Sequence, residues 1–360
     1  ERLLLAPFAM FSADSLGRVH REQEHPYRGP FQRDRDRILH SSAYRRLSGK
    51  MQVFTGEMGD YHRTRLTHTQ EVATIARTIG RALGLNEDLI EALALMHDIG
   101  HPPYGHAGED ALNECIADEG GFSHNQFAIT IAEQLEIRNT GYRGLNLTHE
   151  VLTGQTNRID KATALQPLLE VQLVDAADST TYDAHDTDDA IKLGLVTLDE
   201  MASLGLVRDC IDYVDRNYTA LDADLKRKAV VHRLIERQVT SLLSWCADQL
   251  QQRDFQSHVE AMRSDYRLDH RPELAEQKKE LETFLYARVY RHEKLIAVRQ
   301  EAQQRLKQMF ARYVESPELF PEKYQLRARE IGPRRMAVEY LAGMTDHFCE
   351  QTWRVMFGGH

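Results

Sequence analysis

Apolar residues recur at intervals of three and four along most of this chain, the spacing that brings them onto one face of an α-helix. The segment from Thr67 to Leu85 shows the pattern first, and Thr67 is its expected N-cap. The residues on its shared face are His68, Val72, Ile75, Ile79 and Leu83. We therefore expect a helix over this segment.

A second helix is expected to begin after Asn86, a favourable N-cap, and to end at Gly100, because Pro102 and Pro103 cannot continue it. Further helical patterns cover residues 107–118, the segment after 122–126, and residues 167–193. Beyond residue 220 they cover residues 225–250, 272–314 and 333–353. Strand signals are sparse, and residues 51–58 are predicted to form a short β-ribbon.

These patterns predict an all-α protein. A chain of 360 residues can bury a large core, and this one shows no internal repeat and no low-complexity tract. We expect a helical core over residues 1–220, which includes the N-terminal segment. A C-terminal helical region over residues 221–360 is expected to pack on this core.

Charge and apolar runs narrow the classes of partner. The formal charge is −10, so the surface as a whole does not suit nucleic acid, although local basic patches do. No apolar run reaches the roughly 18 residues that a membrane helix needs, and the segment "ERLLLAPFAMF" lacks the basic region and cleavage site of a signal peptide. The four cysteines are widely spaced without a C-x-x-C motif. This spacing fits a cytoplasmic protein and argues against disulfides or a zinc-thiolate site.

Histidines are numerous, 17 in all, and they gather between His62 and His149. Within this stretch the pair His97-Asp98 ends an apolar helical run, with an isolated His68 upstream and an aspartate-rich segment, "AADSTTYDAHD", downstream. Imidazole and carboxylate groups suit Mn²⁺, Fe²⁺, Co²⁺ or Zn²⁺. The spacing therefore indicates one divalent metal ion between helices. The alternative is that the pair only caps a helix.

Spacing alone does not identify the aspartate that would complete such a site. Asp175, Asp178, Asp183 and Asp186 all lie on one predicted helix. Asp178, Tyr182 and Asp186 follow one another at intervals of four and share a face. Asp175 and Asp178 are three apart, so they are neighbours on the helix surface as well.

The segment after the His-Asp pair carries groups for proton transfer. His106 and Glu109 are three apart at a predicted helix start, so the carboxylate can orient the imidazole as a general acid or base. His101 and His124 could donate hydrogen bonds to phosphates, and Arg65 could bind a phosphate through two nitrogens. The alternative roles are a first-turn carboxylate favoured by the helix dipole, two structural histidines and a surface arginine.

Nearly the whole chain resembles the HD-domain deoxynucleoside triphosphate triphosphohydrolases, a bacterial dGTPase-like family. The matching stretches are "PYRGPFQRDRDRILHSSAYRRLSGKMQVF", "RTRLTHTQEV", "HDIGHPPYGHAGE", "GGFSHNQ", "AADSTTYDAHD" and "YLAGMTD". The resemblance implies an all-α HD fold with a C-terminal helical extension. It also implies cleavage of a dNTP, dGTP or several dNTPs, to deoxynucleoside and tripolyphosphate.

The resemblance assigns roles by motif position. The implied metal ligands are His68, His97, Asp98 and Asp178. The implied catalytic pair is His106 and Glu109, and the phosphate contacts are Arg65, His101 and His124, the last two also assisting catalysis. The implied sugar contacts are Tyr182, Asp186 and Gln52. The expected ion is one Mn²⁺ per site, with Mg²⁺, Co²⁺, Fe²⁺, Ni²⁺ and Zn²⁺ as alternatives, and the expected assembly is a homo-hexamer or homo-tetramer.

The chain departs from the family pattern at Ser179-Thr180, where many relatives carry an acidic residue after the last ligand. This departure bears on base preference and phosphate contacts. The other functions we weighed are another HD-domain phosphohydrolase or phosphodiesterase, and a non-catalytic protein that senses a nucleotide or binds single-stranded nucleic acid. The basic segments "RGPFQRDRDR" and "YRRLSGK" suit such nucleic-acid binding, or a regulatory dNTP.

Overall fold

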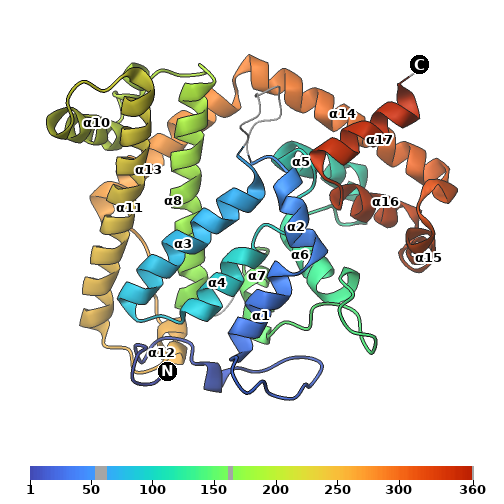
Figure 1. The fold of residues 1–360 in the computed structure, drawn as a ribbon, viewed down its shortest axis with the longest axis horizontal. Helices are drawn as coiled ribbons and strands as arrows, with labels where there is room; N and C mark the ends of the chain where they lie inside the picture. The colour runs from blue at the N-terminus through green and yellow to red at the C-terminus, as the bar shows by residue number, and fades with distance from the viewer. Residues whose placement is uncertain (53–62, 161–164, 359–360) are drawn as a thin grey trace. The chain divides into compact units, whose positions relative to one another are not determined.

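The computed structural model describes residues 1–52, 63–160 and 165–358, which form α-helices joined by loops (Figure 1). β pairing among these residues is limited to isolated bridges, such as the antiparallel one between Met51 and Thr64. The all-α prediction is confirmed. None of the described helices is both long and apolar enough to cross a bilayer.

The helices of the first half of the chain are α1 (Pro30–Leu39), α2 (Ser42–Arg46), α3 (Arg65–Leu83), α4 (Glu87–Met96), α5 (Gly105–Cys115), α6 (His124–Thr130), α7 (His149–Thr156) and α8 (Leu169–Lys192). Those of the second half are α9 (Leu198–Met201), α10 (Gly205–Asn217), α11 (Ala223–Arg253), α12 (His258–Arg263), α13 (Pro272–Leu285), α14 (Glu293–Glu315), α15 (Glu322–Ile331), α16 (Pro333–Ala342) and α17 (Asp346–Phe357).

The chain divides into two compact units that interleave along the sequence. Unit 1 consists of Glu1–Asp14, Glu71–Glu91 and Thr163–Ile296, and unit 2 of Ser15–Gln70, Ala92–Ala162 and Ala297–His360. The division into residues 1–220 and 221–360 stays a prediction.

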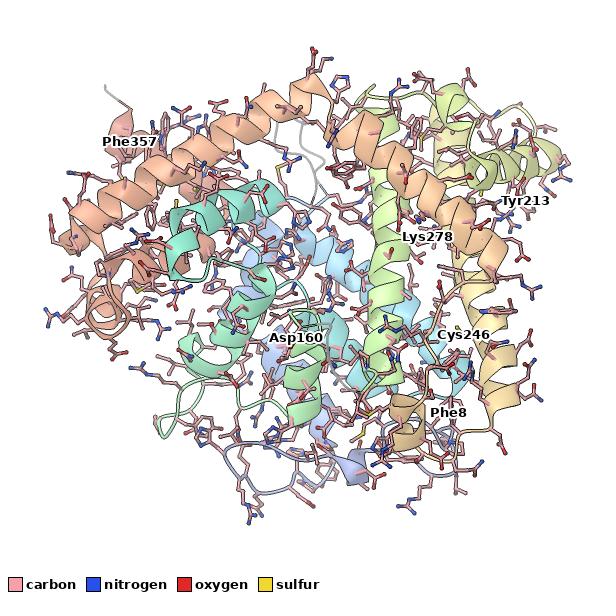
Figure 2. All side chains as sticks on the ribbon, turned by 180° about the vertical axis from the view of Figure 1, so that it is seen from behind. Phe8, Asp160, Tyr213, Cys246, Lys278 and Phe357 are labelled. Atoms are coloured by element: carbon pink, nitrogen blue, oxygen red, sulfur yellow. The ribbon has the colours of Figure 1, made fainter. Side chains whose placement is uncertain are left out.

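Unit 1 is built around α8, beside which α11 runs (Figure 1). Apolar residues of both helices, among them Leu173 of α8 and Leu234 of α11, are buried. Helix α13 also packs on α8, where its Lys278 (labelled in Figure 2) lies 2.8 Å from the buried carboxylate of Asp183. Burial raises the pKa of Asp183 to about 7 despite the attraction of Lys278. The apolar contacts and this ion pair together fix α8 within unit 1.

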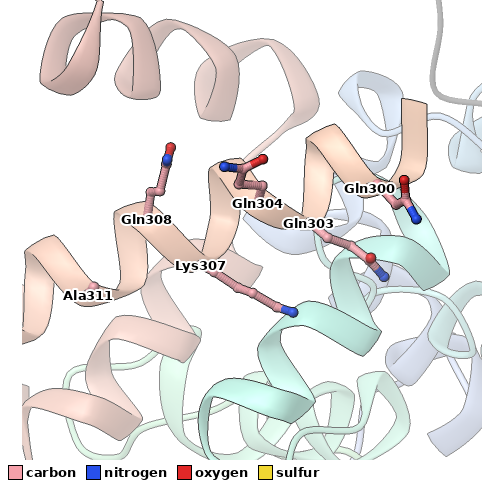
Figure 3. Close-up of a pocket in the computed structure, with 6 residues that line it drawn as sticks. All are labelled: Gln300, Gln303, Gln304, Lys307, Gln308 and Ala311. Atoms are coloured by element: carbon pink, nitrogen blue, oxygen red, sulfur yellow. The ribbon is translucent and has the colours of Figure 1, made fainter. Parts of the chain in front are cut away.

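Unit 2 contains α5, α6 and α7 together with the C-terminal helices. Its Arg327 on α15 forms a two-bond ion pair with Glu339 on α16. A cavity of about 530 Å³ lies along a stretch of α14 that is rich in glutamine (Figure 3). The residues that line it are Gln300, Gln303, Gln304, Lys307, Gln308 and Ala311, and no predicted site residue is among them.

The predicted cap at Asn86 is confirmed, whereas the predicted cap at Thr67 and the predicted end at Gly100 are wrong. The helical patterns over residues 272–314 and 333–353 are each divided into two helices, α13 and α14, and α16 and α17. Asn86 caps α4, because its Oδ1 accepts a hydrogen bond from the Leu89 N–H at 3.3 Å. Thr67 is not the cap of α3: it lies inside the helix, and the Thr64 hydroxyl accepts from its N–H instead. The ribbon predicted over residues 51–58 falls mostly outside the described residues.

Helix α4 ends at Met96, four residues before the predicted end at Gly100. Close packing explains the need for glycine there. A Cβ added to Gly100 would lie 2.0 Å from the His124 carbonyl oxygen and 2.5 Å from the Ala128 nitrogen. The turn over residues 97–100 therefore lies directly against α6, and this contact sets where His97 and Asp98 stand.

We predict that Gly100→Ala lowers the free energy of unfolding by at least about 2 kcal/mol, because the added methyl group overlaps the backbone of α6. Gly141→Ala is the matched control, since its Cβ would meet only the Asn139 side chain at 3.4 Å. Chemical denaturation of both variants measures the difference. Equal midpoints for the two variants would show that the turn does not pack closely on α6.

Candidate active site

The first group of predicted site residues lies together in unit 2. One ligand atom each of His68, His97 and Asp98 lies within 4.8 Å of the others. His68 comes from the first turn of α3, whereas His97 and Asp98 follow α4 directly. All three are buried. Two imidazoles and a carboxylate at this spacing could hold a divalent metal ion.

Hydrogen bonding fixes His97 in the form that a metal needs. Its Nδ1 lies 2.6 Å from the Ala94 carbonyl oxygen, which can only accept a hydrogen bond. The proton of a neutral His97 therefore sits on Nδ1, and Nε2 carries the lone pair. A backbone carbonyl that orients a histidine in this way is a common second layer around metal ions. The donor set thus fits a metal.

Asp98 stays ionised because positive and hydrogen-bonding groups surround it. Arg65 Nη1 lies 3.0 Å from its Oδ2, and His101 Nδ1 and His97 Nε2 lie 3.0 and 3.4 Å from its Oδ1. Burial acts to raise the pKa of Asp98, but these neighbours together lower it well below its usual range. The carboxylate is therefore an anion at neutral pH.

Arg65 is 2% exposed, which excludes the surface role weighed for it. Besides its contact with Asp98, its Nη2 donates to the Gln52 carbonyl oxygen at 3.2 Å. The side-chain Oε1 of Gln52 is buried and has no hydrogen-bond partner within residues 1–52, 63–160 and 165–358. A buried acceptor of this kind is the sort of group that a ligand hydroxyl would satisfy.

A second group lies at the start of α5 and α6, also in unit 2. The Glu109 carboxylate contacts two imidazoles: His124 Nδ1 at 2.8 Å and His106 Nδ1 at 3.2 Å. It also accepts the backbone N–H of His124 at 2.9 Å. Burial acts to raise the pKa of Glu109, but the hydrogen bonds from His106 and His124 outweigh it and lower the pKa. One carboxylate thus orients two histidines.

His101 links the two groups. Its ring centroid is 3.8 Å from that of His124, while its Nδ1 contacts Asp98. Burial, with Arg65 and His124 nearby, lowers the pKa of His101 well below its usual value. His101 is therefore neutral at neutral pH. His106 differs from it in exposure, since 52% of its side chain is exposed and open to a substrate.

The remaining predicted residues lie on α8 in unit 1. Tyr182 stacks against Tyr290 with ring centroids 6.4 Å apart and planes 10° apart. The Tyr290 hydroxyl donates to the buried carboxylate of Asp186. Asp178 is partly buried on the same helix. Of the aspartates that spacing left open, Asp183 is paired with Lys278 and Asp175 is exposed.

Sequence reasoning missed Tyr290. It ends a π-helical turn, η5 (Tyr286–Tyr290), that follows α13. No motif marks it, and it lies 104 residues from Asp186 in the sequence. The aromatic run "YARVY" is its only local signal.

Known proteins match the chain over nearly its whole length. The HD domain model matches residues 65–183 and the phosphohydrolase-associated domain model residues 268–355. A deoxyguanosinetriphosphate triphosphohydrolase-like protein of Geobacter metallireducens is 39% identical over 369 residues, covering 99% of this chain and 96% of its own length. A protein of the same description from Thiobacillus denitrificans is 39% identical over 373 residues, covering 98% and 97%.

We predict that His97→Ala lowers the affinity for Mn²⁺ at least about 100-fold, because a lost first ligand removes more affinity than the 10- to 100-fold typical of its supporting groups. His124→Ala, which alters only the second group, should keep the affinity for Mn²⁺ within about threefold. A supporting residue changes metal affinity strongly when it holds a ligand in place, whereas the His124 imidazole is hydrogen-bonded to Glu109. Isothermal titration calorimetry measures both. The reverse order of effects would place the metal on His101, Glu109 and His124 instead.

Proposed function

Because this chain belongs to the deoxyguanosinetriphosphate triphosphohydrolase-like family of HD-domain phosphohydrolases, we propose that it hydrolyses dNTPs to deoxynucleoside and tripolyphosphate. Water attacks the α-phosphorus and the 5′-oxygen of the nucleoside leaves. One observation carries this proposal: His101 joins a group suited to a metal and a group suited to proton transfer. Phosphate-ester hydrolysis requires both kinds of group in one place.

In this proposal His68, His97 and Asp98 hold a divalent ion, Mn²⁺ by expectation, with Asp178 as the fourth ligand. When bound, such an ion supplies a Lewis acid for phosphate oxygens and lowers the pKa of water. The support is the pattern of donors, namely the His97 lone pair fixed on Nε2 and the ionised Asp98.

His106 moves the proton in the proposed reaction. Its Nδ1 faces Glu109, so its Nε2 is the nitrogen that faces outward. The anionic Glu109 stabilises the doubly protonated imidazole, which can then give its Nε2 proton to the departing 5′-oxygen. Glu109 orients His124 in the same way, so that His124 donates a hydrogen bond to a phosphate oxygen.

The phosphate and sugar contacts follow the family pattern in this proposal. His101, His124 and Arg65 face the phosphates. Tyr182 stacks on the deoxyribose and leaves no room for a 2′-hydroxyl, so ribonucleotides are rejected. Asp186 accepts the 3′-hydroxyl, and binding of the sugar would displace the Tyr290 hydroxyl that now occupies this carboxylate. Gln52 offers its buried Oε1 to the same hydroxyl.

The proposed setting is a cytoplasmic homo-oligomer, a hexamer or tetramer, whose partner molecule is the dNTP substrate. A regulatory dNTP or single-stranded nucleic acid would contact the basic segments around residues 28–37 and 44–50 through exposed side chains such as Arg28 and Arg45, since Lys50 is buried.

We predict that the purified protein with Mn²⁺ converts dNTPs to deoxynucleoside and tripolyphosphate. In ¹⁸O-labelled water, the label should appear in the tripolyphosphate, because attack at the α-phosphorus breaks the bond between phosphorus and the 5′-oxygen. Chromatography with mass spectrometry measures both products. Orthophosphate or pyrophosphate as the first product, or label in the nucleoside, would disprove the proposed reaction.

We predict that His106→Ala lowers kcat at least about 100-fold, the usual contribution of a general acid, while Mn²⁺ affinity stays unchanged. His232→Ala is the control, since His232 is an exposed histidine of α11. Steady-state kinetics and calorimetry measure the two effects. A fully active His106→Ala enzyme would remove His106 from the mechanism.

A further inference from the structure

Asp346 holds two segments that are far from it in the sequence. It is the first residue of α17, yet its carboxylate does not bond to that helix in the usual capping manner. Its Oδ2 accepts the Met51 N–H at 2.9 Å and its Oδ1 accepts the Tyr104 N–H at 3.0 Å. These partners are 295 and 242 residues away. A helix dipole alone would not select this orientation.

Lys50 makes the complementary connection with its side-chain amine. It is 2% exposed, and its Nζ donates to the carbonyl oxygens of His101 and Ala342, the latter at 2.9 Å. The neighbouring Gly49 packs so closely that an added Cβ would lie 2.9 Å from Thr345 Cγ2. The side chains of Asp346 and Lys50 thus join the same three segments, around residues 49–52, 101–104 and 342–346.

Two of the joined segments, residues 49–52 and 101–104, lead into the candidate site. The Lys50 carbonyl accepts the Arg65 N–H at 2.9 Å, and the Gln52 carbonyl accepts Arg65 Nη2 at 3.2 Å. Tyr104 has a φ of 64°, in the left-handed region, and stands immediately before α5. That helix carries His106 and Glu109. The position of the Tyr104 N–H therefore fixes where α5 starts.

We propose that Asp346 is a positioning residue: by holding the Met51 and Tyr104 amides with one carboxylate, it sets Arg65, His101 and His106 against a common substrate. The proposal assigns a role to the "MTD" end of "YLAGMTD", within the phosphohydrolase-associated region. We call the two hydrogen bonds from the Met51 and Tyr104 amides to Asp346 the tether. The catalytic consequence of the proposal rests on the proposed function, whereas the tether itself does not. Burial raises the pKa of Asp346, as expected for a carboxyl group held inside the protein.

Asp346→Asn tests the tether with almost no change of shape. An asparagine has one acceptor oxygen and an NH₂ group that can only donate. One of the two backbone N–H groups must then face another donor. The matched control is Glu150→Gln, because the buried Glu150 also bridges two donors, the Leu16 N–H at 2.7 Å and the Ser15 hydroxyl at 2.8 Å, away from the predicted site residues.

Hydrogen–deuterium exchange followed by mass spectrometry measures the tether directly. In Asp346→Asn, peptides that contain Met51 or Tyr104 should exchange at least about 10-fold faster, since one hydrogen bond of roughly 1.4 kcal/mol corresponds to that factor. In Glu150→Gln, exchange at Met51 and Tyr104 should stay at the wild-type rate, because the Leu16 N–H keeps an acceptor oxygen and the Ser15 hydroxyl can accept from the new NH₂ group. Wild-type exchange at both Met51 and Tyr104 in the Asp346→Asn protein overturns the proposal.

Kinetics then separates positioning from a purely structural role. For variants of equal melting temperature, Asp346→Asn should lower kcat at least about 30-fold, as small misplacements of catalytic groups do, with Mn²⁺ affinity and KM little changed. Glu150→Gln should keep kcat. Fast exchange with wild-type kcat overturns the positioning role. If the wild-type protein cleaves no dNTP, faster exchange still supports the tether and only the proposed function fails.

Discussion

A carboxylate in a protein interior is unfavourable by several kcal/mol unless charges and hydrogen-bond donors surround it. Asp98, 4% exposed, meets this condition through the Arg65 guanidinium and His101 Nδ1. Asp98 and Arg65 compensate each other's buried charge. Arg65 is also buried, and without Asp98 its guanidinium would lose its only ion-pair partner among the described residues. The placement of the other groups in the site therefore depends on this one buried anion.

The site in unit 2 contains two carboxylates, and each belongs to a different group of side chains. Asp98 is enclosed and keeps its charge beside His68 and His97, where a metal ion would add a compensating positive charge. Glu109 is less enclosed and contacts the Nδ1 atoms of two histidines, whose Nε2 atoms would face the substrate in the proposed reaction. His101 contacts both groups and is kept neutral by its burial. Similar residue types thus acquire different tasks from their surroundings.

Sequence patterns predicted the structural features that depend on residues close together in the chain. The spacing of apolar residues found α3, α4 and α8, and the Asn86 cap followed from local hydrogen bonding. The grouping of His68 with His97 and Asp98, and of His106 with Glu109, was expected from motif positions and is present. These features need only helix geometry and short loops.

Contacts between distant segments could not be predicted in this way. Tyr290 reaches Asp186, and Asp346 reaches Met51, through packing that no local pattern encodes. The phosphate role expected of Arg65 stays a prediction, and its ion pair with Asp98 is a contact that its motif position did not predict. The end of α4 was misplaced: the helix stops at Met96, and the turn that follows packs through Gly100 against α6, a tertiary contact that no local pattern encodes.

We propose that the metal ion binds the group around Asp98 and that the proton-transfer groups are those around Glu109. Anomalous diffraction at the manganese absorption edge, from crystals grown with Mn²⁺, distinguishes the two groups. We expect one anomalous peak per chain within bonding distance of His68, His97 and Asp98. A peak bonded instead to His101, Glu109 and His124 would contradict it, because those histidines would then be ligands rather than acids or phosphate contacts.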